Sequence, residues 1–257
     1  MTISIEDIKK LRDSTGVSMS ACKKALEESN SDMDKAFEIL RKKGESKASE
    51  RSERSTANGS ICIKTSGEKG VLLSLLCETD FVARGEDFTK LLEELTQKAL
   101  NGEISSDNLD IVEIKDAQLK MGENIKIGNI AIVEAPILGY YVHTNNKLAS
   151  LVGIEGGDIE LAKDIAMHAS ATNPKYLSPE EVSNDLISKE REIWTEQLSS
   201  EGKTADIIEK ILIGKEKKFR EENALLKQAF VKNPEITIES LVNEKGAKIL
   251  GFIAYSI

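Results

Sequence analysis

The stretch Leu76-Cys77-Glu78-Thr79-Asp80-Phe81-Val82 stands where a largely apolar run, residues 71–76, gives way to a helical pattern. Acidic and hydroxyl residues follow the run, and one large aromatic residue comes next. A corner between a strand and a helix exposes its side chains at the edge of a sheet. In one interpretation Thr79 or Asp80 caps the helix and Phe81 packs back as a hydrophobic staple. In the other, the corner presents Phe81 as an exposed wedge.

The composition describes a globular protein of two or three domains. The chain has 257 residues, of which 40% are hydrophobic and 31% are charged. Its net charge of −9 argues against a general nucleic-acid binder, because a surface that neutralises phosphates is basic. No apolar run approaches the roughly 18 residues of a membrane span, and no signal peptide is visible at the start. Cys22, Cys62 and Cys77 are far apart and fit reduced thiols in a cytoplasm.

The first 44 residues are predicted to form three short helices, a small bundle typical of a docking module. Ser4 and Ser18 can cap the first two helices, and Gly44 is expected to end the third. On that third helix, four apolar residues at helical spacing share one face: Met33, Ala36, Phe37 and Leu40. The polar segment that follows, residues 45–58, is predicted to be a linker. Its basic residues allow an RNA contact as the alternative, but interspersed glutamates favour a solvated linker.

Residues 59–100 and 139–169 repeat one order of elements, which is strand, turn, strand and helix. The predicted fold class is therefore α+β, with two similar subdomains that each lay helices on a small antiparallel sheet. A charged helical hairpin with a thin apolar seam interrupts the second subdomain. The predicted bounds are 1–44 for the three-helix unit, 45–58 for the linker, 59–138 for the first subdomain, 139–179 with 224–257 for the second, and 180–223 for the hairpin.

No residue pattern points to covalent or metal chemistry. Cys77 beside Glu78 and Asp80, with His143 and His168 elsewhere, can be drawn as a thiol nucleophile with its base. No nucleophile motif surrounds the thiol, so a buried strand cysteine and two structural histidines are the favoured interpretation. No Cys or His pair has the spacing of metal ligands, and no phosphate-binding glycine motif occurs. We expect neither a metal nor a cofactor.

Two stretches resemble the signatures of the bacterial translation elongation factor Ts family. They are residues 11–26, LRDSTGVSMSACKKAL, and residues 77–84, CETDFVAR. His143 after two tyrosines, and the run 165–168, are similar to that family's second core half. The resemblance spans essentially the whole chain in order. It implies a ubiquitin-associated-like three-helix domain, a two-part core and a coiled-coil arm.

The resemblance also implies a function, which is guanine-nucleotide exchange on elongation factor Tu in the cytoplasm, without covalent chemistry. Thr79, Asp80, Phe81 and Val82 match the loop that enters the partner's nucleotide domain and disturbs its Mg²⁺ and phosphate site. The implied role of the loop is to promote GDP release. Some members carry a further helical module after the last strand, whose contacts this chain is expected to lack.

Further partner contacts follow from the same resemblance. Arg12, Met19, Ser20 and Lys23 are the implied contacts of the three-helix unit, and His143 is that of the second subdomain. Ser20 stands where some members have a second methionine. Nucleic acid and membrane are not among the expected partners, and a homodimer and a 2:2 complex both stay open. The rival hypotheses are a non-catalytic binding module with a ubiquitin-associated-like domain, and a thiol enzyme.

Overall fold

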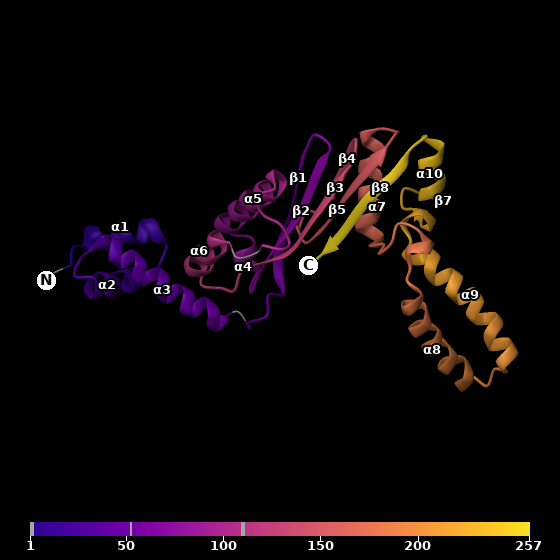
Figure 1. The fold of residues 1–257 in the computed structure, drawn as a ribbon, viewed down its shortest axis with the longest axis horizontal. Helices are drawn as coiled ribbons and strands as arrows, with labels where there is room; N and C mark the ends of the chain where they lie inside the picture. The colour runs from indigo at the N-terminus through magenta and orange to yellow at the C-terminus, as the bar shows by residue number, and fades with distance from the viewer. Residues whose placement is uncertain (1–2, 52, 109–110) are drawn as a thin grey trace.

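The computed structural model describes residues 3–51, 53–108 and 111–257, and for 45–51 it describes the backbone alone. The side chains of residues 45–52, which belong to the predicted linker, therefore lie outside the described part of the chain. The chain forms a three-helix unit, a central body and a helical hairpin, with the unit and the hairpin at opposite ends of the body (Figure 1). Within the described part of the chain, none of the helices combines the length and the apolar character needed to cross a membrane.

The three-helix unit consists of α1 (Ile5–Thr15), α2 (Met19–Glu28) and α3 (Met33–Arg51). Ser4 and Ser18 cap the first two helices, as their positions predict. The prediction that Gly44 ends the third helix is wrong, because α3 continues through it to Arg51. A Cβ atom at Gly44 would lie 2.6 Å from the Cδ1 atom of Leu119, so the glycine serves a close approach between helices.

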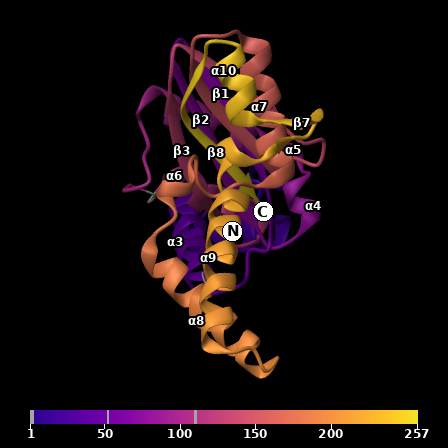
Figure 2. The same cartoon turned by 90° about the vertical axis from the view of Figure 1, so that its right-hand side faces the viewer.

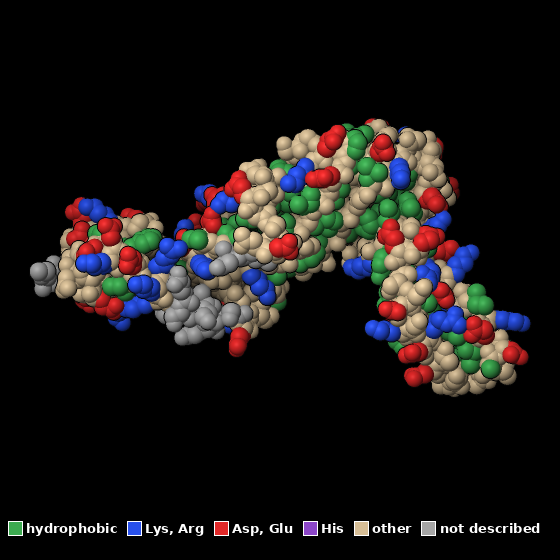
Figure 3. Space-filling view, in the orientation of Figure 1, with side chains coloured by type: hydrophobic (Ala, Val, Ile, Leu, Met, Phe, Trp, Pro, Cys, Tyr) green, Lys and Arg blue, Asp and Glu red, His purple; other side chains and the backbone are tan. Residues whose placement is uncertain are grey.

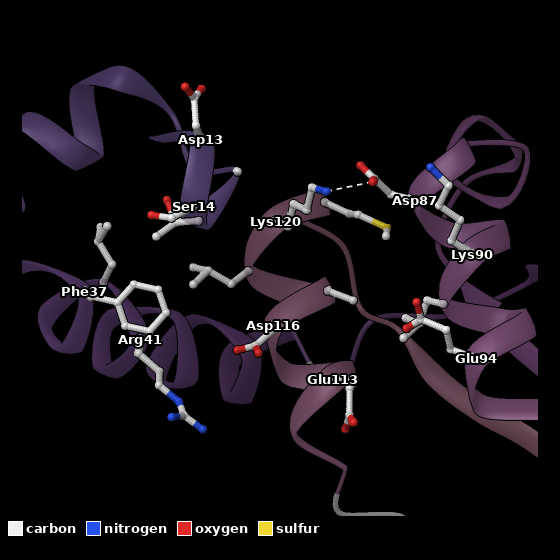
Figure 4. Close-up of a pocket in the computed structure, with 17 residues that line it drawn as sticks. Asp13, Ser14, Phe37, Arg41, Asp87, Lys90, Glu94, Glu113, Asp116 and Lys120 are labelled. Atoms are coloured by element: carbon white, nitrogen blue, oxygen red, sulfur yellow. Dashed lines mark hydrogen bonds and ion pairs between the residues drawn. The ribbon is translucent and has the colours of Figure 1, made fainter. Parts of the chain in front are cut away.

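Phe37, which shares the predicted apolar face, is 43% exposed and does not join the bundle core. Ala36 and Leu40 are buried there and Met33 packs partly against them. Phe37 lies at the margin of this stripe and points toward helix α6 (Val112–Met121) of the body (Figure 4). The bundle is too small to bury both edges of the apolar face.

The central body contains two three-stranded antiparallel sheets, each with helices packed on it. The first has the order β1-β2-β3 and the second the order β4-β5-β8. Helices on small antiparallel sheets are confirmed. The elements of the first half are β1 (Asn58–Ser66), β2 (Lys69–Cys77), α4 (Asp80–Ala83), α5 (Glu86–Asn101), α6 and β3 (Lys126–Glu134). Those of the second half are β4 (Ile137–Val142), β5 (Leu148–Glu155), α7 (Ile159–Thr172), β6 (Ala229–Phe230), β7 (Asn233–Thr237), α10 (Ile238–Glu244) and β8 (Lys248–Ser256).

The apolar run in β2 is explained by burial on both faces of its sheet. Val71, Leu73 and Leu75 contribute to the core under α5 and α6. Leu72 points the other way, into a core shared with Leu151 of β5. The two sheets therefore pack face to face, and helices cover their outer sides (Figures 1 and 2). The sequence does not predict this shared core, nor the short β6–β7 pair.

The hairpin consists of α8 (Asn184–Ser200) and α9 (Ala205–Asn223), which extend away from the body (Figure 2). Its first helix begins at 184 and not at 180, because residues 179–181 form a separate 3-10 turn and Ser183 caps α8. Trp194 packs in the seam between the two helices, whereas the neighbouring Ile193 is 49% exposed. Charged side chains of both signs are spread over this arm (Figure 3).

Candidate functional site

The corner after β2 holds its aromatic residue outside the fold. Thr79 is the N-cap of α4, and its Oγ1 atom accepts a hydrogen bond from the Val82 N–H at 3.4 Å. Val82 and Ala83 pack against the core under the first sheet. The phenyl group of Phe81, between them and the cap, is 84% exposed. Of the interpretation that combined a cap with a staple, the cap is confirmed and the staple is wrong.

The exposure of Phe81 carries an energetic cost that packing does not recover. Burial of a phenylalanine side chain stabilises a fold by about 1.5–3 kcal/mol relative to leaving it in water. Large aromatic residues that protrude in this way are typical anchors of protein interfaces. Beside the ring, the Asp80 carboxylate is paired with Arg84 at 3.2 Å. Both side chains of this pair are open to solvent, so the pair is a weak one.

The carboxylate of Glu123, a residue that follows α6, holds the start of the corner. One oxygen of Glu123, Oε2, accepts hydrogen bonds from the N–H groups of Glu78 at 3.0 Å and of Thr79 at 3.1 Å. Its other oxygen, Oε1, accepts the Thr79 hydroxyl at 2.6 Å. Sequence reasoning missed Glu123, because 44 residues separate it from Thr79. The C-capping Gly122 before it was the one local signal of a turn.

The carboxylate of Glu78 makes the reverse connection. It accepts the Asn124 N–H at 2.7 Å and lies 3.5 Å from the Arg54 guanidinium. The Glu78 carbonyl accepts the Asn58 side-chain amide at 2.9 Å. Asn58 in turn accepts the Lys147 ammonium at 2.9 Å, which links the corner to the second half of the body. The corner is thus held directly by residues 54–58 and 123–124, and indirectly by Lys147 through Asn58.

Cys77 is placed as a structural thiol. Its Sγ donates to the Thr79 carbonyl at 3.1 Å, and burial, with the nearby Glu123 charge, raises the pKa of the thiol to about 11. A thiol in that state is a poor nucleophile near neutral pH, because the thiolate is the reactive form. His168 is fully buried, where its Nε2 lies 3.0 Å from the Gln228 side chain and its Nδ1 accepts the Val231 N–H at 3.3 Å. The thiol-enzyme hypothesis finds no support in this arrangement.

The predicted contact residues of the three-helix unit, Arg12, Met19, Ser20 and Lys23, are all exposed. In the sequence they lie on either side of Gly16, whose positive φ of 68° ends α1. Gly16 lines one hollow together with Phe81 and Val82. The fold therefore brings the turn between α1 and α2 close to the corner, although more than 60 residues separate them in the sequence.

A second pocket, of about 380 Å³, lies next to that hollow, between α1 and α3 on one side and α5 and α6 on the other (Figure 4). An ion pair of 2.7 Å between Lys120 and Asp87 crosses its rim. Among residues 3–44, 53–108 and 111–257, no group of three or more His, Cys, Asp and Glu side chains could hold a metal ion.

His143 lies at the end of β4, apart from the three-helix unit. Its Nδ1 atom is 3.0 Å from the hydroxyl of Tyr141, and the ring is half-buried. The turn that follows it contains Lys147, which reaches Asn58 as described. His143 therefore belongs to the same end of the body as the corner, on the neighbouring sheet.

Comparison with known proteins assigns the family. A family model described as elongation factor TS matches residues 78–257, which include the corner and the whole second half of the body. Elongation factor Ts of Teredinibacter turnerae is 39% identical over 271 residues, which cover 100% of this chain and 91% of that protein. The chain belongs to the elongation factor Ts family.

Other members of the elongation factor Ts family match over the same length. The protein of Francisella tularensis subsp. novicida is 40% identical over 266 residues, covering 99% of this chain and 92% of the relative. That of Hahella chejuensis is 38% identical over 266 residues, with the same coverage. The resemblance based on residues 11–26 and 77–84 is thereby confirmed, and the chain is a translation elongation factor by family.

Proposed function

We propose that this chain is the guanine-nucleotide exchange factor of elongation factor Tu in the cytoplasm, where it binds the GDP form and promotes GDP release. Family membership supports the proposal. The observation that carries it is the 84% exposure of Phe81 on a corner whose backbone is held by several hydrogen bonds. An exposed, fixed aromatic group is suited to enter another protein.

In the proposed mechanism, Thr79, Asp80, Phe81 and Val82 press into the nucleotide domain of the partner. Phe81 acts as a wedge between partner side chains, and Asp80 brings a negative charge close to the Mg²⁺ and phosphate site. Mg²⁺ neutralises phosphate charge and links the nucleotide to protein, so a disturbed Mg²⁺ site holds GDP less tightly. The coupling is reciprocal. If binding of this chain weakens the affinity of elongation factor Tu for GDP, bound GDP weakens the affinity of elongation factor Tu for this chain to the same extent. No covalent bond forms at any step.

The rest of the molecule supplies further contacts. We assign Arg12, Met19, Ser20 and Lys23 to the partner's nucleotide domain and His143 to a more distant domain. The three-helix unit would act as a ubiquitin-associated-like docking domain, and the α8–α9 arm as a coiled coil. Assembly as a homodimer or a 2:2 complex is compatible with this scheme, and the net charge of −9 disfavours direct nucleic-acid contact.

Release of fluorescent GDP from elongation factor Tu tests the proposal. Phe81→Ala should slow the catalysed release by about tenfold or more, equivalent to about 1.4 kcal/mol of activation free energy. Its thermal unfolding midpoint should stay close to that of the wild type, because the removed ring is exposed. Cys77→Ser is the matched control, and it should release GDP at the wild-type rate if it is folded.

Two outcomes would contradict the proposal. Loss of activity in Cys77→Ser with an unaffected Phe81→Ala variant would favour the thiol enzyme. Binding to elongation factor Tu with no acceleration of GDP release, in the wild-type protein, would favour a non-catalytic binding module.

A further inference from the structure

We propose that Glu123 is a positioning residue for exchange, which fixes the backbone at Glu78 and Thr79 and thereby sets where Phe81 stands. The inference rests on the proposed function, because it assigns a task to a residue that lies behind the proposed wedge. Glu123 itself follows α6, at the start of the turn into β3. It acts on the corner from within the chain, without touching the partner itself.

The two oxygens of Glu123 meet three donors of the corner. Successive N–H groups, those of Glu78 and Thr79, converge on Oε2 at 3.0 and 3.1 Å, and the Thr79 hydroxyl donates to Oε1 at 2.6 Å. Hydrogen bonds to a carboxylate are shorter and stronger than those between neutral groups. Because all three donors belong to two adjacent residues, the carboxylate fixes both the position and the orientation of this short segment.

The corner needs an outside acceptor at this point. The β1–β2 ladder ends at the pair Asn58 and Cys77, so the next two N–H groups have left the sheet. Helix α4 begins at Asp80, and the N–H groups before a helix have no acceptor inside it. Both amides lie in a half-buried segment, where an unpaired N–H is costly. Glu123 supplies the acceptor for both.

The hydroxyl of Thr79 passes this constraint on toward Phe81. A hydroxyl group has one proton to donate. In Thr79 that proton goes to Glu123, and the same oxygen accepts the N–H of Val82, the residue after Phe81. Asn124 closes the connection by donating its N–H to the Glu78 carboxylate at 2.7 Å. The segments around residues 78 and 123 therefore hold each other reciprocally.

Phe81 depends on this support because its own ring makes little contact with the fold, being 84% exposed. The direction in which it projects is set by the backbone of α4, and α4 is a single turn of four residues. A group held in its working geometry before encounter loses less freedom on binding, and small misplacements reduce rates strongly. Loss of Glu123 should therefore weaken exchange without removal of any residue that touches the partner.

The decisive experiment is a double-mutant cycle measured by the release of fluorescent GDP from elongation factor Tu. Glu123→Ala should slow release by about tenfold in the presence of Phe81, because a misplaced contact group lowers the rate. In the Phe81→Ala background the same change should have little further effect, because the residues would act through one wedge. An equal slowing in both backgrounds, or no slowing in either, would overturn the inference.

Two conservative variants separate the effect of the length of the Glu123 side chain from the effect of its charge. Glu123→Asp keeps the charge but is shorter by one carbon–carbon bond, about 1.5 Å, and cannot reach all three donors. Glu123→Gln keeps the reach, and its amide oxygen can still accept the two N–H groups. Positioning predicts slower exchange for Asp than for Gln. The opposite order would mean that the charge matters and not the placement, and the inference would be wrong.

Glu181→Ala is the matched control for a general loss of stability. Its carboxylate also accepts a backbone N–H, that of Leu177 at 2.8 Å, but at the base of the arm. It should exchange nucleotide at the wild-type rate. Amide hydrogen exchange of the free proteins gives a second readout, in which residues 80–85 should lose protection in the Glu123 variants and keep it in Glu181→Ala. Unchanged protection of that segment in Glu123→Ala would count against the inference, whatever its unfolding midpoint.

The cycle also separates this inference from the proposed function. If Phe81→Ala leaves GDP release unchanged, the wedge itself is refuted and the role of Glu123 falls with it. If Phe81→Ala slows release while Glu123→Ala does not, the proposed function stands and the positioning role alone is refuted.

Discussion

The backbone of Gly44 in α3 lies against the side chain of Leu119 in α6, so closely that a Cβ atom at residue 44 would come within 2.6 Å of the leucine Cδ1 atom. This contact is part of the interface through which the three-helix unit packs against the body. It explains why a helix passes through a glycine that costs about 1 kcal/mol of helix stability relative to alanine. Close packing at this point offsets a poor local propensity.

Gly44 and Gly214 make a matched pair of helical glycines for a first prediction. A Cβ atom at Gly214 in α9 would meet nothing within 4 Å. Gly214→Ala should therefore stabilise the arm by about 0.5–1 kcal/mol. Gly44→Ala should bring no gain, or a loss, because Leu119 must move. Amide hydrogen exchange of each helix measures both effects, and an equal gain at the two sites would show that Leu119 does not restrict residue 44.

His168 leads to a second prediction, which concerns acid pH. Burial lowers the pKa of its imidazole below the ordinary value of 6.5. Between the folded and the unfolded pKa the unfolded chain binds more protons, so its population grows as the pH falls. The contribution of His168 to stability should thus be complete above about pH 6.5 and should decline below it.

Urea unfolding midpoints between pH 8 and pH 5 measure this dependence. His168→Gln, which cannot titrate, should be less stable at pH 8 because it disturbs the contacts with Gln228 and Val231. Its midpoint should depend less on pH below 6.5 than that of the wild type. Parallel curves for the two proteins would assign the acid sensitivity to other groups.

The base of the arm gives a third prediction. The guanidinium of Arg220 donates to the Val182 carbonyl at 2.6 Å, to the Asn184 side chain at 2.9 Å and to Glu216 at 3.0 Å. Its side chain is only 20% exposed. Arg220→Lys keeps the charge but loses the planar set of donors, and should destabilise the attachment of the arm by about 1–3 kcal/mol.

Trp194 provides the readout for this change, since it is the only tryptophan of the chain and packs against Phe219 with ring centres 5.7 Å apart. Its fluorescence transition in urea should move to lower denaturant in Arg220→Lys, ahead of the loss of far-ultraviolet circular dichroism. Lys218→Ala, which removes an exposed ion pair with Glu222, should leave both transitions in place. Coincident transitions in all three proteins would mean that the arm unfolds with the body.

The sequence allowed prediction of those elements whose periodicity is strong. The strand at residues 71–76 and the order strand, turn, strand and helix over residues 59–100 follow from apolar spacing, and both are confirmed. Gly44 misled the prediction because a glycine at a helix end and a glycine at a close helix contact look alike in sequence. Only the position of Leu119 separates the two cases.

The site was predictable in part, for a similar reason. The residues of the corner were found because they form one contiguous stretch, and the cap at Thr79 follows from local chemistry. Whether Phe81 is exposed depends on what lies opposite to it, which no local pattern contains. Glu123 was missed because a single glutamate after a helix is common and its donors lie far away in the chain.

The core that Leu72 shares with Leu151 has a mechanical consequence. Since the two sheets are joined through their buried faces, the two halves of the body cannot slide past each other or separate without exposing apolar surface to water. The shared core therefore fixes the separation between the α4 corner, which follows a strand of one sheet, and the turn after β4, which belongs to the other. A protein that contacts both the corner and the turn therefore meets them at a separation that the shared core maintains.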